Sequence, residues 1–197
     1  CAETALFEIQ KRTTDQFSVG YLGSLGTWYM LDEMLEFFIE LNKKVDSIFL
    51  FVTKDNPDKI IKVAVKLGIS KDKIKIVSSE RKMMPSYIGV SDCSIFFILP
   101  CYSKIGSSPT KMGEIMNLGI PIVCNPGVGD VEEIMEKTMP QILVKTFTQN
   151  AYKSAVNNLI KTNFNKTKII NTSHEIYSLQ LGSRKYIEIY SELLNKP

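Results

Sequence analysis

Two stretches of this chain, residues 48–52 (IFLFV) and 95–99 (IFFIL), are apolar at every position. A strand with one face in water alternates polar and apolar residues, whereas an uninterrupted apolar run is typical of a strand that helices cover on both faces. Strands of that kind are parallel, and each parallel neighbour is reached through a helical crossover. The two stretches therefore predict a helix-covered parallel sheet.

Six short runs rich in β-branched and aromatic residues are predicted as strands, with helical-period segments between them. The predicted strands are residues 17–23, 47–53, 73–78, 93–99, 120–124 and 141–145. The predicted helices are residues 28–43, 57–67, 84–90, 109–118, 130–136 and 148–162. This order predicts an α/β fold with a doubly wound, Rossmann-like parallel sheet of about six strands and helices on both faces.

The chain after the last predicted strand is expected to be helical to its end, with residues 170–197 forming a C-terminal helical segment. Four apolar residues there share one helical face: Tyr186, Ile189, Tyr190 and Leu193. We expect this stripe to contact the core. Residues 17–197 are thus predicted to be one domain, preceded by a linker in residues 1–16.

The composition excludes several classes of protein. At 197 residues, with 44% hydrophobic and 23% charged residues, the chain is long enough for one globular core and unlike a disordered chain. Its apolar runs are far shorter than the roughly 20 residues of a membrane span. The four cysteines form no C-x-x-C pair and are predicted to be reduced thiols of a cytoplasmic protein. The single histidine, His174, leaves little material for a zinc site or a catalytic triad, so no metal site is expected.

Charge is nearly balanced, with 24 Lys and Arg residues against 21 Asp and Glu, and this predicts no nucleic-acid partner. Between Lys137 and His174, however, five further lysines occur without an acidic residue. Such a stretch either faces an anionic membrane or a lipid-linked phosphate, or forms a solvated helix face. The wide spacing of the lysines favours the solvated face, and peripheral membrane contact stays the alternative.

Ligands of open parallel sheets bind at the carboxyl ends of the strands, so the loops at those ends are candidate sites. The first predicted strand is followed by Gly23, Ser24, Leu25 and Gly26. Glycines let backbone amides approach a phosphate, and the start of the next helix adds positive potential. The spacing matches neither a dinucleotide fingerprint nor a P-loop. By itself this loop is equally compatible with a tight turn that holds no ligand.

The loop after the fourth predicted strand leads into a helix: Ser107, Ser108, Pro109, Thr110 and Lys111. Ser108 is a suitable N-cap and Pro109 suits the first helical position, so the free amides of the helix should face this loop. Glu114 shares a face with Thr110, and helix side chains lean toward the N-terminus, which brings the carboxylate to the same mouth.

A carboxylate at that mouth can accept two hydrogen bonds from a ribose diol, and Lys111 can meet phosphate charge. The spacing of Lys111 and Glu114 is equally compatible with a surface ion pair between the two.

Residues 108–123 read SPTKMGEIMNLGIPIV, and residues 125–130 read NPGVGD. These motifs resemble the donor-binding half of the group 1 (family 4) retaining glycosyltransferases of GT-B architecture. The resemblance covers roughly residues 19–136, including the first strand and its loop (VGYLGSLG, residues 19–26) and the segment 81–92. Residues 1–7 (CAETALF) resemble the interdomain linker of such enzymes. An acceptor-binding domain outside this chain is therefore expected to precede residues 1–16.

The resemblance implies a role for each candidate residue. Glu114 matches the glutamate that holds the ribose hydroxyls of the donor nucleotide. Amides at the helix start match those that cradle the diphosphate: Ser107, Ser108 and Thr110. The loop after the first strand is expected on the opposite side of the phosphate: Gly23, Ser24 and Gly26. Residues 77–81, which include Ser79 and Arg81, are expected near the base, and no obligatory cofactor or metal is implied beside the UDP- or GDP-sugar donor.

Two positions depart from the family pattern. The glutamate expected eight residues before Glu114, near the transferred sugar, is replaced by Gly106. The Arg and Lys often found just after the first strand are absent from residues 26–30 (GTWYM). We expect Lys111, together with Arg81, to supply the missing positive charge.

The leading hypothesis is the donor-binding domain of a retaining glycosyltransferase that transfers sugar from UDP or GDP to a saccharide or lipid-linked acceptor in polysaccharide biosynthesis. The fragment alone is expected to turn over poorly. The alternative is a non-catalytic nucleotide-binding or interaction module of the same fold, which the two departures suit. Hydride transfer ranks last, because no acidic residue ends the second predicted strand.

Overall fold

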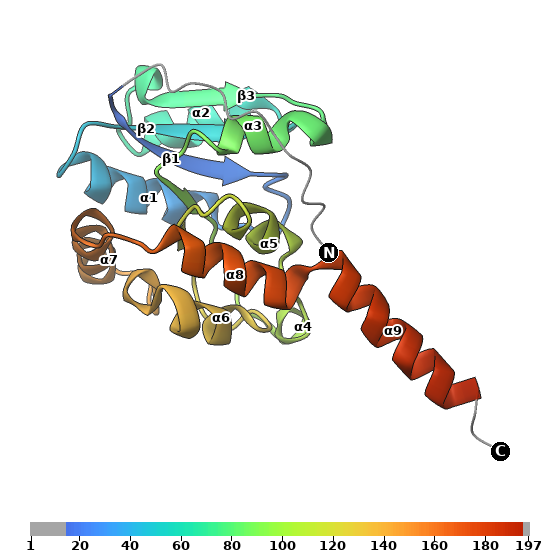
Figure 1. Ribbon diagram of the computed structural model, residues 1–197. Helices are drawn as coiled ribbons and strands as arrows, with labels where there is room; N and C mark the ends of the chain where they lie inside the picture. The colour runs from blue at the N-terminus through green and yellow to red at the C-terminus, as the bar shows by residue number, and fades with distance from the viewer. Residues whose placement is uncertain (1–14, 195–197) are drawn as a thin grey trace.

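The computed structural model describes residues 15–194, in which helices cover both faces of a parallel sheet (Figure 1). The strands are β1 (Phe17–Leu22), β2 (Ser47–Val52), β3 (Ile74–Val77), β4 (Cys93–Ile95) and β5 (Ile122–Val123). They lie in the order β3-β2-β1-β4-β5, and every neighbouring pair is parallel. The predicted α/β class and the parallel sheet are confirmed, with five strands.

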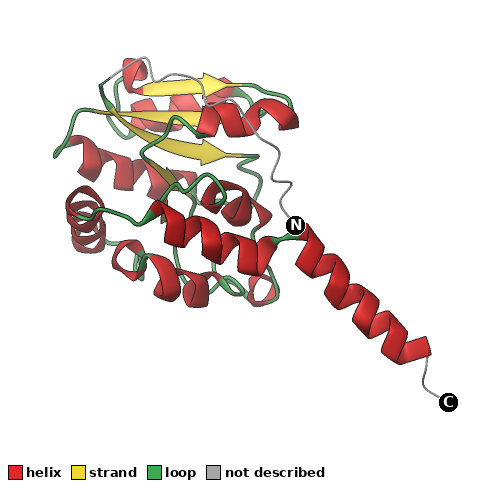
Figure 2. Cartoon of the chain, in the orientation of Figure 1, coloured by secondary structure: helices red, strands yellow, loops and turns green. Residues whose placement is uncertain are grey.

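The helices form one layer on each face of the sheet (Figure 2). They are α1 (Leu31–Asn42), α2 (Pro57–Lys66), α3 (Met84–Ile88), α4 (Tyr102–Ile105), α5 (Thr110–Met116), α6 (Val131–Thr138), α7 (Gln149–Lys161), α8 (Lys166–Tyr177) and α9 (Leu179–Leu194). Short 3-10 turns occupy Lys71–Lys73, Arg81–Met83 and Pro140–Ile142. One layer joins α1 with α2 and α7, and the other joins α3, α5, α6 and α8. The short helix α4 was not predicted.

The apolar strands form the centre of the core. Phe49 and Phe51 of β2 are fully buried, and their rings stack with centroids 4.2 Å apart. Burying a side chain of this size stabilises the fold by about 1.5–3 kcal/mol. On β1, a Cβ at Gly20 would stand 2.4 Å from atoms of both Ile88 and Ser91. Glycine at this position therefore lets α3 and the turn after it pack directly on β1.

The sixth predicted strand, residues 141–145, is wrong. A 3-10 turn runs from Pro140 to Ile142. Proline has no N–H to donate to a strand ladder and suits the first position of a helical turn. Only one bridge follows, between Leu143 and Cys124, with the Val144 N–H donating to the Cys124 oxygen at 2.8 Å. This segment lies beside the end of β5 without extending the sheet as a strand.

The C-terminal segment is helical as predicted through Leu194, but its apolar stripe does not contact the core. The exposed fractions of the four predicted core residues are 65%, 54%, 60% and 58%, respectively, for Tyr186, Ile189, Tyr190 and Leu193. In Figure 1, α9 projects away from the body of the domain. The cause is Ser178, whose ψ of 129° interrupts the helix and turns the chain away after α8.

Two predictions about the surface and the termini stay predictions. The lysines between residues 145 and 168 are exposed, which fits a solvated face and leaves membrane contact untested. Among residues 15–194, no helix has both the length and the apolar character needed to cross a membrane. Most of the predicted linker, residues 1–14, and the last three residues of the predicted C-terminal segment lie outside the described part of the chain.

Candidate functional site

The strand order places the candidate site between β1 and β4. The chain moves from β1 to β2 and β3 in one direction, then crosses back and moves from β4 to β5 in the other. The loops that leave these two adjacent strands therefore diverge and open a crevice at their carboxyl ends. An antiparallel bridge joins Tyr29 and Ile98 there, and the Leu99 N–H donates to the Trp28 oxygen at 2.8 Å. Because residues 28–30 take part in this pairing, α1 begins at Leu31 rather than at residue 28 as predicted.

The glycine loop after β1 has a backbone that a ligand can approach closely. Gly23 and Gly26 have φ angles of 99° and 49°, which side chains rarely adopt. The Gly23 N–H donates to the Val52 oxygen at 2.9 Å. Within residues 15–194, the N–H groups of Ser24 and Gly26 donate to no protein acceptor. If this loop lines a phosphate, as predicted, those two N–H groups are the ones in it that are free to donate to the phosphate.

Asp55, in the loop after β2, holds the glycine loop in place and was not predicted as a site residue. Its carboxylate accepts from the Leu25 N–H and, at 2.9 Å, from the Ser24 hydroxyl. Burial raises the pKa of Asp55, but hydrogen bonds from Leu25, Ser24 and Thr53 outweigh it, so the pKa lies below its usual value. The sequence offers one indication of its role: Asp55 lies in the loop after β2, a strand that neighbours β1.

Lys111 reaches from α5 to the glycine loop. Its Nζ lies 3.7 Å from the centroid of the Tyr29 ring and 4.4 Å from that of Tyr21, and it donates to the Tyr21 hydroxyl at 3.3 Å. The same Nζ would stand 3.4 Å from a Cβ at Gly23. Burial lowers the pKa of Lys111 to about 7, against the opposing charges of Glu114 and Asp55.

The two tyrosines beside Lys111 are neutral phenols. The Tyr21 hydroxyl donates to the Ser24 oxygen at 2.8 Å, which ties the lysine to the glycine loop through one hydrogen-bonded chain. Burial raises the pKa of Tyr21 and of Tyr29 above the usual value. The aromatic rings stabilise the ammonium form of Lys111 through their faces without supplying a negative charge.

Glu114 and Arg81 meet at the other end of the crevice. Their Oε1 and Nη2 atoms lie 3.3 Å apart, and the exposed fractions of the side chains are 32% and 84%. The surface pair between Glu114 and Lys111, left open from the sequence, is therefore replaced by a pair with Arg81. Ser79, also predicted near the base, is buried and donates its hydroxyl to the Glu80 oxygen at 3.1 Å.

The start of α5 differs from the prediction. The N-cap is Pro109, with no side-chain cap, and α5 begins at Thr110. Ser108 was predicted to cap the helix, but its hydroxyl donates to Asp130 Oδ2 at 3.0 Å. That contact joins this loop to the NPGVGD loop after β5, where Gly129 approaches so closely that a Cβ would lie 1.7 Å from the Ser107 oxygen.

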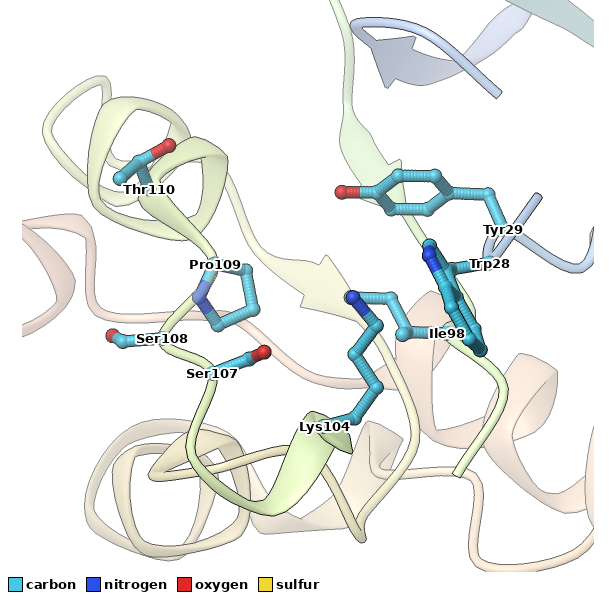
Figure 3. Close-up of a pocket in the computed structure, with 8 residues that line it drawn as sticks. All are labelled: Trp28, Tyr29, Ile98, Lys104, Ser107, Ser108, Pro109 and Thr110. Atoms are coloured by element: carbon cyan, nitrogen blue, oxygen red, sulfur yellow. The ribbon is translucent and has the colours of Figure 1, made fainter. Parts of the chain in front are cut away.

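A cavity of about 230 Å³ opens between the two loops (Figure 3). Its lining consists of Trp28, Tyr29, Ile98, Lys104, Ser107, Ser108, Pro109 and Thr110. Lys104 comes from the unpredicted helix α4, and its Nζ lies 4.7 Å from the Trp28 ring centroid. Trp28 is 41% exposed and forms one wall.

Gly106, at the position of the missing glutamate, has an ordinary backbone conformation with φ −91° and ψ 12°. A Cβ there would meet nothing within 4 Å. The fold itself therefore does not require glycine at this position. In the described part of the chain, no cluster of three or more His, Cys, Asp or Glu residues could hold a metal ion.

Comparison with protein families gives one match over most of the chain. The family model for glycosyl transferases group 1 matches residues 3–175. No curated protein matches the chain.

Several solved structures with a similar fold are glycosyltransferases. AviGT4, involved in avilamycin A biosynthesis, is similar with a TM-score of 0.70 and 13% identity, over 91% of this chain and 51% of its own. A glycosyltransferase from Rickettsia africae has a TM-score of 0.67 and 18% identity, over 93% and 49%. The pneumococcal O-GlcNAc transferase GtfA, solved with UDP and GlcNAc, has a TM-score of 0.67 and 10% identity, over 91% and 36%. At these identities the likeness shows the fold alone, and the chain spans about half or less of each of these proteins.

Proposed function

Because this chain belongs to the glycosyl transferases group 1 family, we propose that it binds the nucleoside diphosphate of a UDP- or GDP-sugar in the crevice between β1 and β4. The observation that carries the proposal is the position of Lys111. A helix on one side of the crevice holds its amine against the glycine loop on the other side, between two neutral aromatic rings. An amine so enclosed, against a loop that carries two unbonded backbone N–H groups, suits a doubly charged phosphate group.

The proposed pose runs along α5. Glu114 accepts hydrogen bonds from the ribose hydroxyls, and its pair with Arg81 holds the carboxylate in place at the crevice. Lys111 and the Ser24 and Gly26 amides then face the diphosphate. Because Arg81 pairs with Glu114, residues 77–81 lie next to the proposed ribose position, which supports a place for the base there.

The chemical role follows from where charge develops. When the bond between sugar and diphosphate breaks, negative charge grows on the departing diphosphate, and fixed donors and a cation stabilise it most effectively where water is excluded. Lys111 is the residue that we assign to that task. Transfer with retention of anomeric configuration is part of the proposal, and it rests on the motif of residues 108–123.

We also propose that a second domain supplies the acceptor side of the crevice. The similar structures are about twice the length of this chain or longer. In addition, α9 exposes an apolar stripe that nothing within residues 15–194 covers, which suits a helix with a protein partner. The acceptor in this proposal is a saccharide or a lipid-linked saccharide. The free thiols of Cys93, Cys101 and Cys124 support a reducing, cytoplasmic location.

A second candidate function is a nucleotide-binding module without transferase activity. Gly106 favours it, because the position leaves room for a glutamate that the chain does not have. Sugar transfer by the protein with its acceptor-binding domain would exclude this candidate, and binding without transfer would support it.

The test of nucleotide binding uses the chain as it stands. Its melting temperature is measured with increasing UDP, GDP, ADP and NAD, since a ligand at 100 times its Kd adds about 2.7 kcal/mol of stability. The proposal predicts a rise with UDP or GDP and none with NAD. No response to any of the nucleoside diphosphates would contradict it.

A further inference from the structure

The cavity beside Trp28 adjoins the proposed diphosphate site. Tyr29 and Thr110 line it, and Lys111, the next residue after Thr110, packs on the Tyr29 ring at 3.7 Å. Along α5 the order is therefore the cavity at Thr110, the diphosphate at Lys111 and the ribose at Glu114. A nucleotide sugar placed in that order puts its glycosyl unit in the cavity, so this inference rests on the proposed function.

The size of the cavity suits one sugar ring. Its volume of about 230 Å³ leaves room for several water molecules, and hence for a small polar ring. Hydroxyl groups of Ser107 and Thr110 and the exposed indole of Trp28 provide polar and flat apolar surface. This combination is common where a protein holds a small polar ring.

The charge of the lining is positive. Lys104 is the only charged side chain among the eight lining residues, and no carboxylate is among them. In Figure 3 its ammonium group extends into the space between Trp28 and the start of α5. Within residues 15–194, no Asp or Glu forms an ion pair with it. Its positive charge therefore faces the cavity without an acidic partner.

The backbone holds Lys104 at this position. Its carbonyl oxygen accepts from the Ser107 N–H at 3.1 Å and from the Gly129 N–H at 3.0 Å, which ties α4 to the loop before α5 and to the loop after β5. Two residues further on and next to the lining residue Ser107, Gly106 carries no side chain, although the space around it is open. The segment 104–106 therefore supplies a cation on an anchored backbone and lacks the carboxylate that would bind the hydroxyl groups of a neutral sugar.

We propose that this cavity binds the glycosyl unit of the donor and selects a unit that carries a carboxylate, as in a uronic acid, through an ion pair with Lys104. A carboxylate accepts charge-assisted hydrogen bonds from the ammonium group, whereas the hydroxymethyl group of a neutral hexose receives only a weaker hydrogen bond. The competing role for Lys104 is to bind the diphosphate itself, next to Lys111.

The experiment measures dissociation constants of the chain by calorimetric titration. The probes are UDP, UDP-glucose and UDP-glucuronate, with GDP, GDP-mannose and GDP-mannuronate as the second set. We expect the uronate-linked nucleotide to bind about tenfold more tightly than the hexose-linked one, which corresponds to about 1.4 kcal/mol. Lys104→Met should remove this preference and leave the Kd for the free nucleoside diphosphate within about twofold.

Two further variants sharpen the test. Gly106→Glu places a carboxylate at the open position two residues after Lys104 and should also remove the preference for the uronate. Lys161→Met removes an exposed lysine at the end of α7 and should leave all affinities unchanged.

The outcomes separate this inference from the proposed function. Equal affinity for UDP-glucose and UDP-glucuronate, in a chain that binds UDP, overturns the selectivity alone. A loss of UDP affinity in Lys104→Met as large as the loss of UDP-glucuronate affinity overturns it too, because Lys104 then serves the diphosphate. Failure of both UDP and GDP to bind contradicts the proposed function and this inference with it.

Discussion

Replacing Lys111 with methionine is predicted to stabilise the empty domain and weaken nucleotide binding. The amine lies against two phenol rings in a desolvated site, and no carboxylate forms an ion pair with it among residues 15–194. Methionine is also unbranched, is one atom shorter, and fills most of the same space without a charge. A residue whose removal stabilises the fold and impairs binding is one that the fold keeps for its function.

The magnitude follows from the pKa. Burial lowers it from the ordinary value of 10.5 to about 7. At pH 7 this pKa shift alone lowers the free energy of unfolding by about 4 kcal/mol, since each pKa unit corresponds to about 1.36 kcal/mol. Partial exposure and the two ring contacts reduce the net cost to about 2 kcal/mol. The methionine variant should be more stable by about that amount.

The direction in which the stability difference changes with pH follows from proton binding. Between pH 7 and 10.5 the unfolded chain binds the lysine proton more tightly than the folded chain, so the wild-type chain gains stability relative to the variant as the pH rises. The difference between the two should therefore shrink from about pH 7 to about pH 9.5. A bound diphosphate reverses the balance by raising the pKa of Lys111, so binding should take up protons at about pH 8.

The assay is urea unfolding of both chains at the two pH values, with calorimetric titration of UDP in buffers of different ionisation enthalpy. Lys161→Met, at an exposed position, serves as the matched control and should change stability by less than about 0.5 kcal/mol. The reasoning is refuted if Lys111→Met is less stable than the wild-type chain, or if their difference does not depend on pH.

Two other positions give sharp expectations, both measured by urea unfolding. Gly113→Ala should lose about 1–3 kcal/mol, because its Cβ would stand 2.5 Å from Cγ of Tyr177 and push α8 away from α5, whereas Gly106→Ala should cost less than about 0.5 kcal/mol; equal effects would contradict this packing. Asp55→Asn should lose about 1–2 kcal/mol at pH 7, because the hydrogen bond from Leu25 to a charged oxygen weakens. Since the pKa of Asp55 is lowered in the folded chain, this loss should vanish as the pH falls through that pKa, and a loss that is the same at pH 7 and at low pH would contradict the assignment.

Much of the architecture could be predicted from the residues because it follows from local patterns. The uninterrupted apolar runs, one in β2 and one that begins at the last residue of β4, required cover on both faces, although β4 ends at Ile95 and not at residue 99 as predicted. The helical segments between the strands required parallel neighbours. Because ligands of such sheets bind at the strand ends, the sequence then pointed to the loop that contains Gly23 and to the helix start that contains Lys111, and the structure brings these two residues together. The resemblance to group 1 glycosyltransferases is confirmed by the family match over residues 3–175.

The features that were missed depend on contacts between distant segments or on single dihedral angles. Asp55 acts on a loop that is 30 residues away in sequence, and no local pattern announces that hydrogen bond. Lys104 matters only because the chain after β4 folds back beside Trp28. The direction of α9 is decided by the backbone of Ser178, so an apolar stripe that was predicted to face the core lies in solvent.

In the proposed function, Lys111 takes the place of the basic residues expected after β1. A lysine on α5 reaches the same space from the opposite wall, and the Tyr21 hydroxyl links it to Ser24. Positive charge at the crevice can therefore come from either wall, and it does not depend on one sequence motif. We infer that substitutions in the glycine loop and in α5 affect one binding site.

The most direct test of the proposed site is calorimetric titration of UDP and GDP into the chain and into Glu114→Gln, with Glu136→Gln on the exposed surface of α6 as the control. We predict that one of the two nucleotides binds, that Glu114→Gln weakens it about tenfold while the melting temperature stays the same, and that the control binds as the wild type does. Unchanged affinity in Glu114→Gln would contradict the assignment of the ribose to this carboxylate, and no binding of either nucleotide would contradict the site itself.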